Sequence, residues 1–236
     1  MFPSSQLIEE SQILFEDNHL IIINKKSSEI VQGDKTGDMP LSEKVKNYIK
    51  QRDNKPGNVF CGVCHRLDRP VSGIVIFAKT SKALSRMNEL FRDKTIQKTY
   101  WAVVKNKPAH LTERLVHYLI KNEQTNKSKA YADEKKGSLK AELSYTVIAS
   151  STTYHLLEIN LYTGRHHQIR TQLSAIGCSI KGDLKYGFDR SNADASIHLH
   201  SYKAEFIHPV KLEKMSVTCF PNVKDPVWKA LVEATK

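Results

Sequence analysis

The chain has 236 residues and a formal net charge of +11, from 36 lysines and arginines against 25 aspartates and glutamates. A chain of this length can bury a core without disulfides or a structural metal, and a hydrophobic content of 40% excludes a disordered tail. No apolar run approaches the ~20 residues of a membrane-spanning helix, and no export signal opens the sequence, so we expect a cytoplasmic protein with no membrane contact. The excess positive charge favours a polyanionic partner, nucleic acid ahead of an acidic membrane surface.

The first elements expected along the chain are a hairpin and a helix. Apolar runs at residues 13–15 and 20–24 flank a turn-forming Glu-Asp-Asn segment, which is the pattern of a β-hairpin. After Pro40, which can open a helix, four apolar residues fall on one helical face: Leu41, Val45, Tyr48 and Ile49.

A buried strand, a second helix and another strand follow. Residues 74–77 form a short continuous apolar run bounded by polar residues. The next helix is expected to begin with Ser81 as its cap and to end near Asp93, with four residues facing inward: Leu84, Met87, Leu90 and Phe91. Residues 99–105 are apolar on both faces, which indicates a strand in a sheet that is covered on both sides.

The second half of the chain is dominated by strands. The lysine-rich residues 121–140 predict a hairpin loop or flexible excursion between strands at 115–120 and 142–149. The later elements expected are strands at 154–161, 196–206 and 214–220, a helix from Arg165 to Ile176 stopped by Gly177 in a left-handed cap, and a terminal helix at 225–236. Strands and helices do not alternate regularly, so we expect an α+β fold around a largely antiparallel sheet, in one domain.

Common cofactor and metal motifs are missing from the sequence. It contains no Gly-x-x-x-x-Gly-Lys-Ser/Thr, no Gly-x-Gly-x-x-Gly and no His-Glu-x-x-His, which removes the main support for NTPase, dinucleotide-binding and zinc-protease functions. Cys61 and Cys64 form a Cys-x-x-Cys without a second close pair, so buried thiols are favoured over zinc. His198 and His200 would share a strand face, but no third ligand is suitably spaced. We therefore expect no metal site.

Asp68 is the first candidate for chemistry. It stands in His65-Arg66-Leu67-Asp68-Arg69-Pro70-Val71-Ser72-Gly73, where two arginines bracket the carboxylate in a loop that leads into the buried strand. Nearby cations lower a carboxylate pKa by about 1 to 3 units, so we expect an ionised group ready to act as nucleophile or base. A turn aspartate that is salt-bridged for order is the alternative.

Arg165 is the second candidate. It stands in Thr163-Gly164-Arg165-His166-His167-Gln168-Ile169-Arg170, at the start of an expected helix. Winding at ~100° per residue places Arg165 on the apolar face with Ile169 and Leu173, and in the first turn, where the helix dipole disfavours a cation. Such a guanidinium requires a fixed anion, either a carboxylate or a phosphate, and Asp68 is the candidate partner. Snorkelling of the arginine to water is the alternative.

These strings together resemble the RluA family of RNA pseudouridine synthases. The segment 65–73 resembles the catalytic signature of that family, and Lys98-Thr99-Tyr100-Trp101-Ala102-Val103-Val104 resembles its Lys-x-Tyr strand. The segment 163–170 resembles its arginine motif, and Ile180-Lys181-Gly182-Asp183 with Tyr186-Gly187 is similar to the glycine-rich stretch that follows. The likeness runs from about Ile13 to Phe220, in four ordered motifs.

The resemblance implies the pseudouridine synthase fold, with a long mixed sheet, and an isomerase activity without cofactor. A uridine in RNA would be detached at N1, turned, and rejoined through C5 to C1′ of the same ribose. Asp68 takes the position of the catalytic aspartate, which either attacks C1′ or removes the 2′ proton. Tyr100 takes the position of the tyrosine that stacks on the target base, and Arg165 that of the arginine that pairs with the aspartate.

RNA contacts are expected from four further residues of the motifs: Arg66, Arg69, His166 and Arg170. For the three arginines, ordering salt bridges are the alternative. The likeness covers a core of about residues 13–220 in a single catalytic domain of 1–236, and we expect no amino-terminal S4 domain and a monomer. The expected partner is a stem-loop of rRNA or tRNA. A non-catalytic RNA-binding or RNA-folding module on the same scaffold is the main alternative, and a base-excising glycosidase a weaker one.

Overall fold

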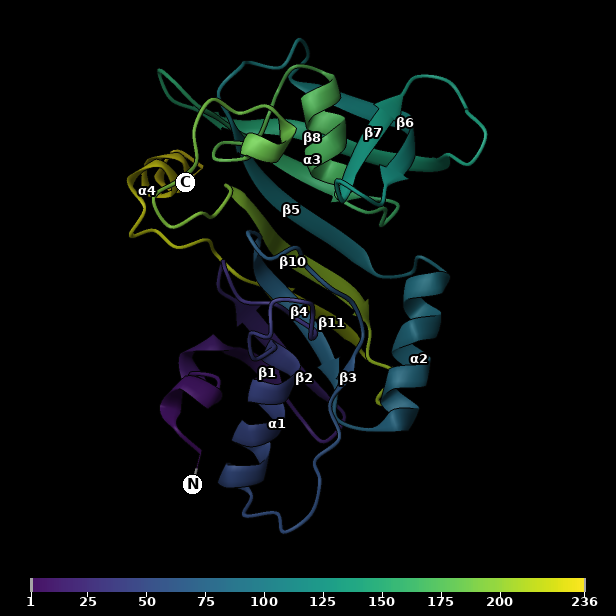
Figure 1. The fold of residues 1–236 in the computed structure, drawn as a ribbon, viewed down its shortest axis with the longest axis vertical. Helices are drawn as coiled ribbons and strands as arrows, with labels where there is room; N and C mark the ends of the chain where they lie inside the picture. Colours follow the sequence, from purple (N-terminus) through teal and green to yellow (C-terminus); the bar gives the residue numbers. More distant parts are fainter. Residues whose placement is uncertain (1, 236) are drawn as a thin grey trace. The chain divides into compact units, whose positions relative to one another are not determined.

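The computed structural model describes residues 2–235, which form two compact units (Figure 1). Unit 1 comprises the chain up to Ile96 together with Lys203–Cys219. Unit 2 comprises Gln97–Tyr202 together with the chain from Phe220 onward. Strand β10, Leu199–Ile207, therefore begins in unit 2 and ends in unit 1.

Unit 1 contains strands of the sheet and two helices. Its strands are β1 (Ile13–Glu16), β2 (Leu20–Lys25), β3 (Gly62–Val63), β4 (Ser72–Ala78), the end of β10, and β11 (Lys214–Thr218). Strand β2 pairs antiparallel with β1 and with β4, β3 pairs with the end of β4, and β11 pairs with β10. The helices are α1 (Leu41–Arg52) and α2 (Ser81–Arg92), and short 3-10 turns lie at Ser4–Gln6 and Glu10–Gln12.

The two helices of unit 1 cover opposite faces of its sheet. Successive residues of a strand point to opposite faces, and here Ile22 packs in one cluster with Met87 of α2, while Ile21 packs in another with Val45 of α1. All four side chains are fully buried. Burying each of these side chains stabilises the fold by roughly 1.5–3 kcal/mol, so apolar packing alone holds a helix on each face of the sheet.

The strands of unit 2 lie in the order β5, β9, β8, β6, β7 and pair antiparallel, with the first residues of β10 beside β5. The strands are β5 (Gln97–Val104), β6 (Thr112–Asn122), β7 (Lys127–Tyr131), β8 (Leu139–Ser150) and β9 (His155–Leu161). The helices are α3 (Gln168–Ala175) and α4 (Pro226–Glu233), and a 3-10 turn lies at Leu184–Tyr186.

Helix α4 closes one side of the unit 2 core. Asp225 caps it by accepting hydrogen bonds from the amides of Val227 and Trp228, and Pro226 occupies the first helical turn, where its missing N–H is not needed. Trp228 then packs against Trp101 and other apolar residues of the sheet. Within residues 2–235 no helix combines the length and the apolar composition that crossing a membrane requires.

The α+β class, the first hairpin and the first two long helices confirm the predictions. One cap is corrected, because Thr80 and not Ser81 caps α2: the Thr80 hydroxyl accepts a hydrogen bond from the Ala83 amide at 3.2 Å. Thr80 has extended backbone angles, whereas Ser81 is already helical. The four residues expected to face inward from this helix do pack against the core.

The prediction of a loop or flexible excursion at 121–140 is wrong. Part of the segment is strand β7, which pairs antiparallel with β6. Lys127 and Lys129 are exposed on one face of this strand, while Ser128 is buried on the other. The inward residues are small and weakly apolar, so the alternation that marks a strand is hidden among the lysines.

Candidate functional site

Asp68 lies in unit 1, in the loop between β3 and β4, and its side chain is partly exposed. The backbone on both sides of it is tied down. Val71 donates its amide to the Asp68 carbonyl at 3.0 Å, which closes a turn, and Ser28 donates its amide to the Arg69 carbonyl at 2.9 Å. The loop therefore holds the Asp68 backbone in one conformation while a bound molecule can still reach the carboxylate.

Lys25, the last residue of β2, is a buried cation beside this loop. Its side chain is fully buried, and its ammonium donates to the carbonyls of Lys26 at 2.9 Å and Arg69 at 3.1 Å. Burial lowers the pKa of Lys25 to about 8, although the charges of Glu29 and Asp68 act in the opposite direction. The sequence does not mark Lys25 as part of the site, because a lysine at a strand end is ordinarily a surface residue.

The arginines that bracket Asp68 have different surroundings. The Arg69 guanidinium donates to Asp38 at 2.7 Å and to Thr36 at 2.7 Å, and also lies 3.4 Å from Asp34. For Arg69 the structure thus forms the ordering salt bridge, which tethers residues 34–38 to the Asp68 loop. Arg66 is exposed, and its contact with RNA stays a prediction.

Tyr100 lies in unit 2, in β5, and is almost fully buried. Lys98 precedes it in the same strand and meets the arginine motif: its ammonium is 3.6 Å from the position that a Cβ on Gly164 would occupy. Burial lowers the pKa of Lys98. The Lys-x-Tyr strand and the arginine motif are therefore neighbours in space, which the order of the motifs along the sequence does not show.

Arg165 precedes α3 and does not lie in its first turn, so the helical-wheel argument for its environment is wrong. Helix α3 begins at Gln168, because His167 adopts the left-handed conformation with φ 52° and starts the helix after the expected position. The Arg165 side chain is partly buried, and its Nε donates to the Lys140 carbonyl at 3.0 Å. The residue is thus held by a loop conformation and not by a helix face.

Gln168 organises the loop that carries Arg165. Its side chain is buried, and its Oε1 accepts from the Thr163 hydroxyl at 2.7 Å and from the Arg165 amide at 3.0 Å. Its amide nitrogen donates to the Glu142 carbonyl of β8 at 3.1 Å. One buried side chain therefore fixes both the loop and its attachment to the sheet.

The two histidines of the motif continue this network. Their rings stack with centroids 3.8 Å apart. The Nδ1 of His166 lies 2.9 Å from the Ser128 hydroxyl on β7, and the Nδ1 of His167 lies 2.9 Å from the Tyr186 hydroxyl. His166 is partly buried, and its predicted contact with RNA stays a prediction.

Arg170 forms a buried ion pair. Of the two roles that the sequence left open, an RNA contact and an ordering salt bridge, the structure forms the salt bridge. Its Nε and Nη2 donate to the two carboxylate oxygens of Asp183 at 2.7 and 2.8 Å, and both side chains are buried, with 6% and 1% exposed. The guanidinium also lies 5.0 Å from the Tyr186 ring centroid. With its fork occupied by Asp183, Arg170 orders α3 and the glycine-rich stretch.

The histidine and cysteine candidates for metal binding are buried side chains of the protein core. His198 is buried, lies 3.1 Å from Asp225 and 3.0 Å from the Asn192 amide, and burial lowers its pKa to about 4. The Cys61 and Cys64 thiols are buried, which raises the pKa of each to about 12. Among the described residues, no group of three or more potential ligands could hold a metal ion.

The three catalytic candidates are divided between the units, Asp68 in unit 1 and Tyr100 and Arg165 in unit 2. Each unit holds its own candidates by the contacts described above. The pairing of Asp68 with Arg165 remains a prediction.

Solved structures define the class of this fold. Human RNA pseudouridylate synthase domain containing 4 superposes with a TM-score of 0.74 at 23% identity, covering 89% of this chain and 88% of that chain. Human RNA pseudouridylate synthase domain containing 1 gives a TM-score of 0.73 at 20% identity, covering 98% and 90%. At these identities the likeness establishes the fold, which is the pseudouridine synthase fold.

Sequence relatives then give the family. The family model described as RNA pseudouridylate synthase matches residues 19–175, so the chain belongs to this family and the predicted resemblance is confirmed. Proteins named ribosomal large subunit pseudouridine synthase C are similar: that of Buchnera aphidicola is 34% identical over 88% of this chain, that of Haemophilus influenzae 32% over 85%, and that of Vibrio cholerae 30% over 91%. The chain spans 66%, 62% and 68% of the lengths of these relatives.

Proposed function

We propose that this protein isomerises a uridine of large-subunit ribosomal RNA to pseudouridine. The observation that carries the proposal is the family membership together with three candidate residues, Asp68, Tyr100 and Arg165, each standing in its own motif. Relatives named as pseudouridine synthases of the ribosomal large subunit favour that substrate over tRNA. The net charge of +11 suits a polyanion in either case.

Asp68 is the residue that we assign to the ribose. The N1–C1′ bond breaks, the base turns, a C5–C1′ bond forms, the C5 proton leaves and N1 takes up a proton, so no electrons are gained or lost overall. The Asp68 carboxylate acts either on C1′ or on the 2′ proton. The loop contacts of Lys25 and Ser28 keep its backbone in place during this change, which is the preorganisation that such a step requires.

Tyr100 and Arg165 are assigned to the base and to the carboxylate. Stacking of the everted uracil on Tyr100 contributes about 1–3 kcal/mol, which offsets part of the few kcal/mol that removing a base from its stack costs. Arg165 is the residue that we assign as the cationic partner of the Asp68 carboxylate. Gln168 supports this role, because its buried side chain accepts a hydrogen bond from the Arg165 amide and so fixes the Arg165 backbone.

Pseudouridine mapping tests the proposal. We expect that deleting the gene removes one or a few pseudouridines from large-subunit ribosomal RNA, detected by carbodiimide modification and primer extension. The wild-type gene should restore them, and an Asp68→Asn gene should not.

Two other results would contradict the proposal in different ways. Loss of pseudouridine from tRNA alone would keep the reaction and overturn the substrate. An unchanged pseudouridine map in every RNA would overturn the reaction and favour the non-catalytic RNA-binding module.

A further inference from the structure

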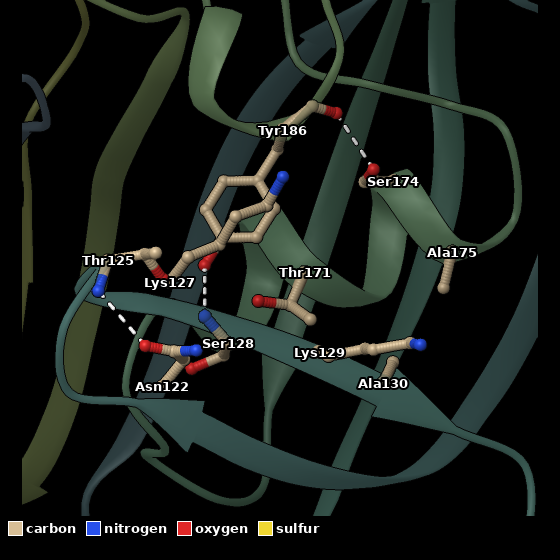
Figure 2. A pocket seen from close by; sticks show the side chains of 10 residues that line it. All are labelled: Asn122, Thr125, Lys127, Ser128, Lys129, Ala130, Thr171, Ser174, Ala175 and Tyr186. Carbon is tan, nitrogen blue, oxygen red and sulfur yellow. Dashed lines mark hydrogen bonds between the residues drawn. The ribbon is translucent and has the colours of Figure 1, made fainter.

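A groove in unit 2 lies apart from the residues assigned to the reaction. It runs between the β6–β7 hairpin and helix α3 and has a volume of about 480 Å³ (Figure 2). The residues that line it are Asn122, Thr125, Lys127, Ser128, Lys129, Ala130, Thr171, Ser174, Ala175 and Tyr186. Two of them are lysines and none is acidic, so the lining carries only positive charge.

Lys127 and Lys129 form the charged wall of the groove. They occupy alternate positions of β7, so their side chains leave the same face of the strand about 7 Å apart. Both are exposed, and neither forms an ion pair with another residue of the range 2–235. Each ammonium lies 5.2 Å from a tyrosine ring centroid, and Glu123 of the adjacent turn is engaged by Lys121 at 2.6 Å. Both ammonium groups are therefore available to an external anion.

Helix α3 supplies a wall of a different kind. The Thr171 hydroxyl donates to the His167 carbonyl at 2.9 Å, and the Ser174 hydroxyl donates to the Tyr186 carbonyl at 2.8 Å. The Ser174 side chain is partly exposed, and since its proton is used by the Tyr186 carbonyl (Figure 2), its oxygen is left as an acceptor; Thr171 is buried, with 3% exposed. A ligand that fits both walls carries negative charge on one side and a hydroxyl donor on the other.

The groove is attached to the loop that carries Arg165. Ser128, between the two lysines, donates its hydroxyl to the His166 carbonyl at 2.9 Å and its amide to the Tyr186 hydroxyl at 2.8 Å. A chain bound along β7 is thereby next to residues that are continuous with the arginine motif.

We propose that this groove binds the backbone of the RNA strand, with Lys127 and Lys129 on successive phosphates and Ser174 accepting from a ribose 2′-hydroxyl. This proposal rests on the proposed function, which supplies RNA as the substrate. RNA fits better than a free anion, because the lysines form a row along an open groove and do not converge on one point. The 2′-hydroxyl is a donor that DNA lacks.

The test is the salt dependence of RNA binding by a Lys127→Gln/Lys129→Gln variant. Binding of a fluorescein-labelled fragment of large-subunit ribosomal RNA is followed by anisotropy over a series of potassium chloride concentrations. Loss of two phosphate contacts on a single strand should reduce the slope of log K against log salt by about 1.4. A Lys135→Gln/Lys136→Gln variant, which changes two exposed lysines outside the groove, should keep the wild-type slope.

The outcomes separate this proposal from the proposed function. Equal slopes for the two variants would overturn the groove assignment. A wild-type protein that binds RNA through these lysines and forms no pseudouridine would refute the proposed function alone. With active protein, the groove variant should raise KM and leave kcat unchanged.

Discussion

Replacing Arg170 by methionine should destabilise unit 2 severely. The pair that it forms with Asp183 has both carboxylate oxygens bonded by the guanidinium, and 1% of the Asp183 side chain is exposed. Methionine approximates the volume of the arginine stem but leaves this carboxylate without its cation. Removing one partner of such a buried pair costs about 3–5 kcal/mol, which is a large share of the 5–15 kcal/mol that stabilises a typical domain.

Urea unfolding followed by circular dichroism measures this loss. We expect Arg170→Met to lower the free energy of unfolding by about 3–5 kcal/mol, and Asp183→Asn to lower it as well, since it leaves the guanidinium buried without its anion. Arg92→Met serves as control, because 72% of the Arg92 side chain is exposed and its one ion pair among residues 2–235 is with its neighbour Asp93 at 3.5 Å. The control should stay within about 0.5 kcal/mol of wild type.

The alternative role of Arg170 gives the opposite pattern. If the guanidinium contacts an RNA phosphate in solution, Arg170→Met would keep wild-type stability and weaken RNA binding, and Asp183→Asn would leave both unchanged. That result would refute the assignment of Arg170 to an ordering ion pair.

Two further predictions concern buried basic side chains. Because the pKa of His198 is lowered to about 4, the unfolded chain binds a proton at this group at a higher pH than the native protein does. The free energy of unfolding should therefore fall by about 3 kcal/mol as pH drops from 6.5 to 4. In urea titrations His198→Gln should remove this part of the pH dependence of stability, and an unchanged pH dependence would contradict the prediction. Because the pKa of Lys25 is lowered to about 8, the Lys25 ammonium of the unfolded chain keeps its proton to a higher pH than that of the native protein. Between pH 8 and 10.5 the free energy of unfolding should therefore increase by about 3 kcal/mol relative to that of Lys25→Met. Parallel curves of unfolding free energy against pH for the two proteins would refute the lowered pKa.

Local patterns predicted those elements whose inward faces are strongly apolar. Helix α2 is evident because Met87 and its neighbours repeat at helical spacing, and β2 because its apolar run fills both faces of a sheet. Strand β7 has no such signal, since Ser128 faces inward between exposed lysines and is fixed by hydrogen bonds to residues far along the chain. The helix was predicted to begin at Arg165 and begins at Gln168, because the spacing of apolar residues does not reveal that His167 adopts a left-handed conformation.

The sequence motifs of the candidate site could be predicted, but the side chains that surround its residues in the fold could not. Asp68, Tyr100 and Arg165 stand in recognisable motifs, so the residue types themselves carry the information. Lys25 and Gln168 could not be found in this way, because their roles depend on acceptors and donors that folding brings to them. The boundary between the units was equally hidden, since the chain returns to unit 1 in the middle of β10 with no change in composition.

The most direct measurement is tritium release by purified protein from large-subunit ribosomal RNA labelled at uracil C5, since formation of the C5–C1′ bond expels that hydrogen. We expect release by wild type and by Asp133→Asn, which makes the same chemical change at an exposed aspartate of unit 2, and none above background by Asp68→Asn. Equal release by Asp68→Asn and wild type would contradict the assignment of catalysis to the Asp68 carboxylate.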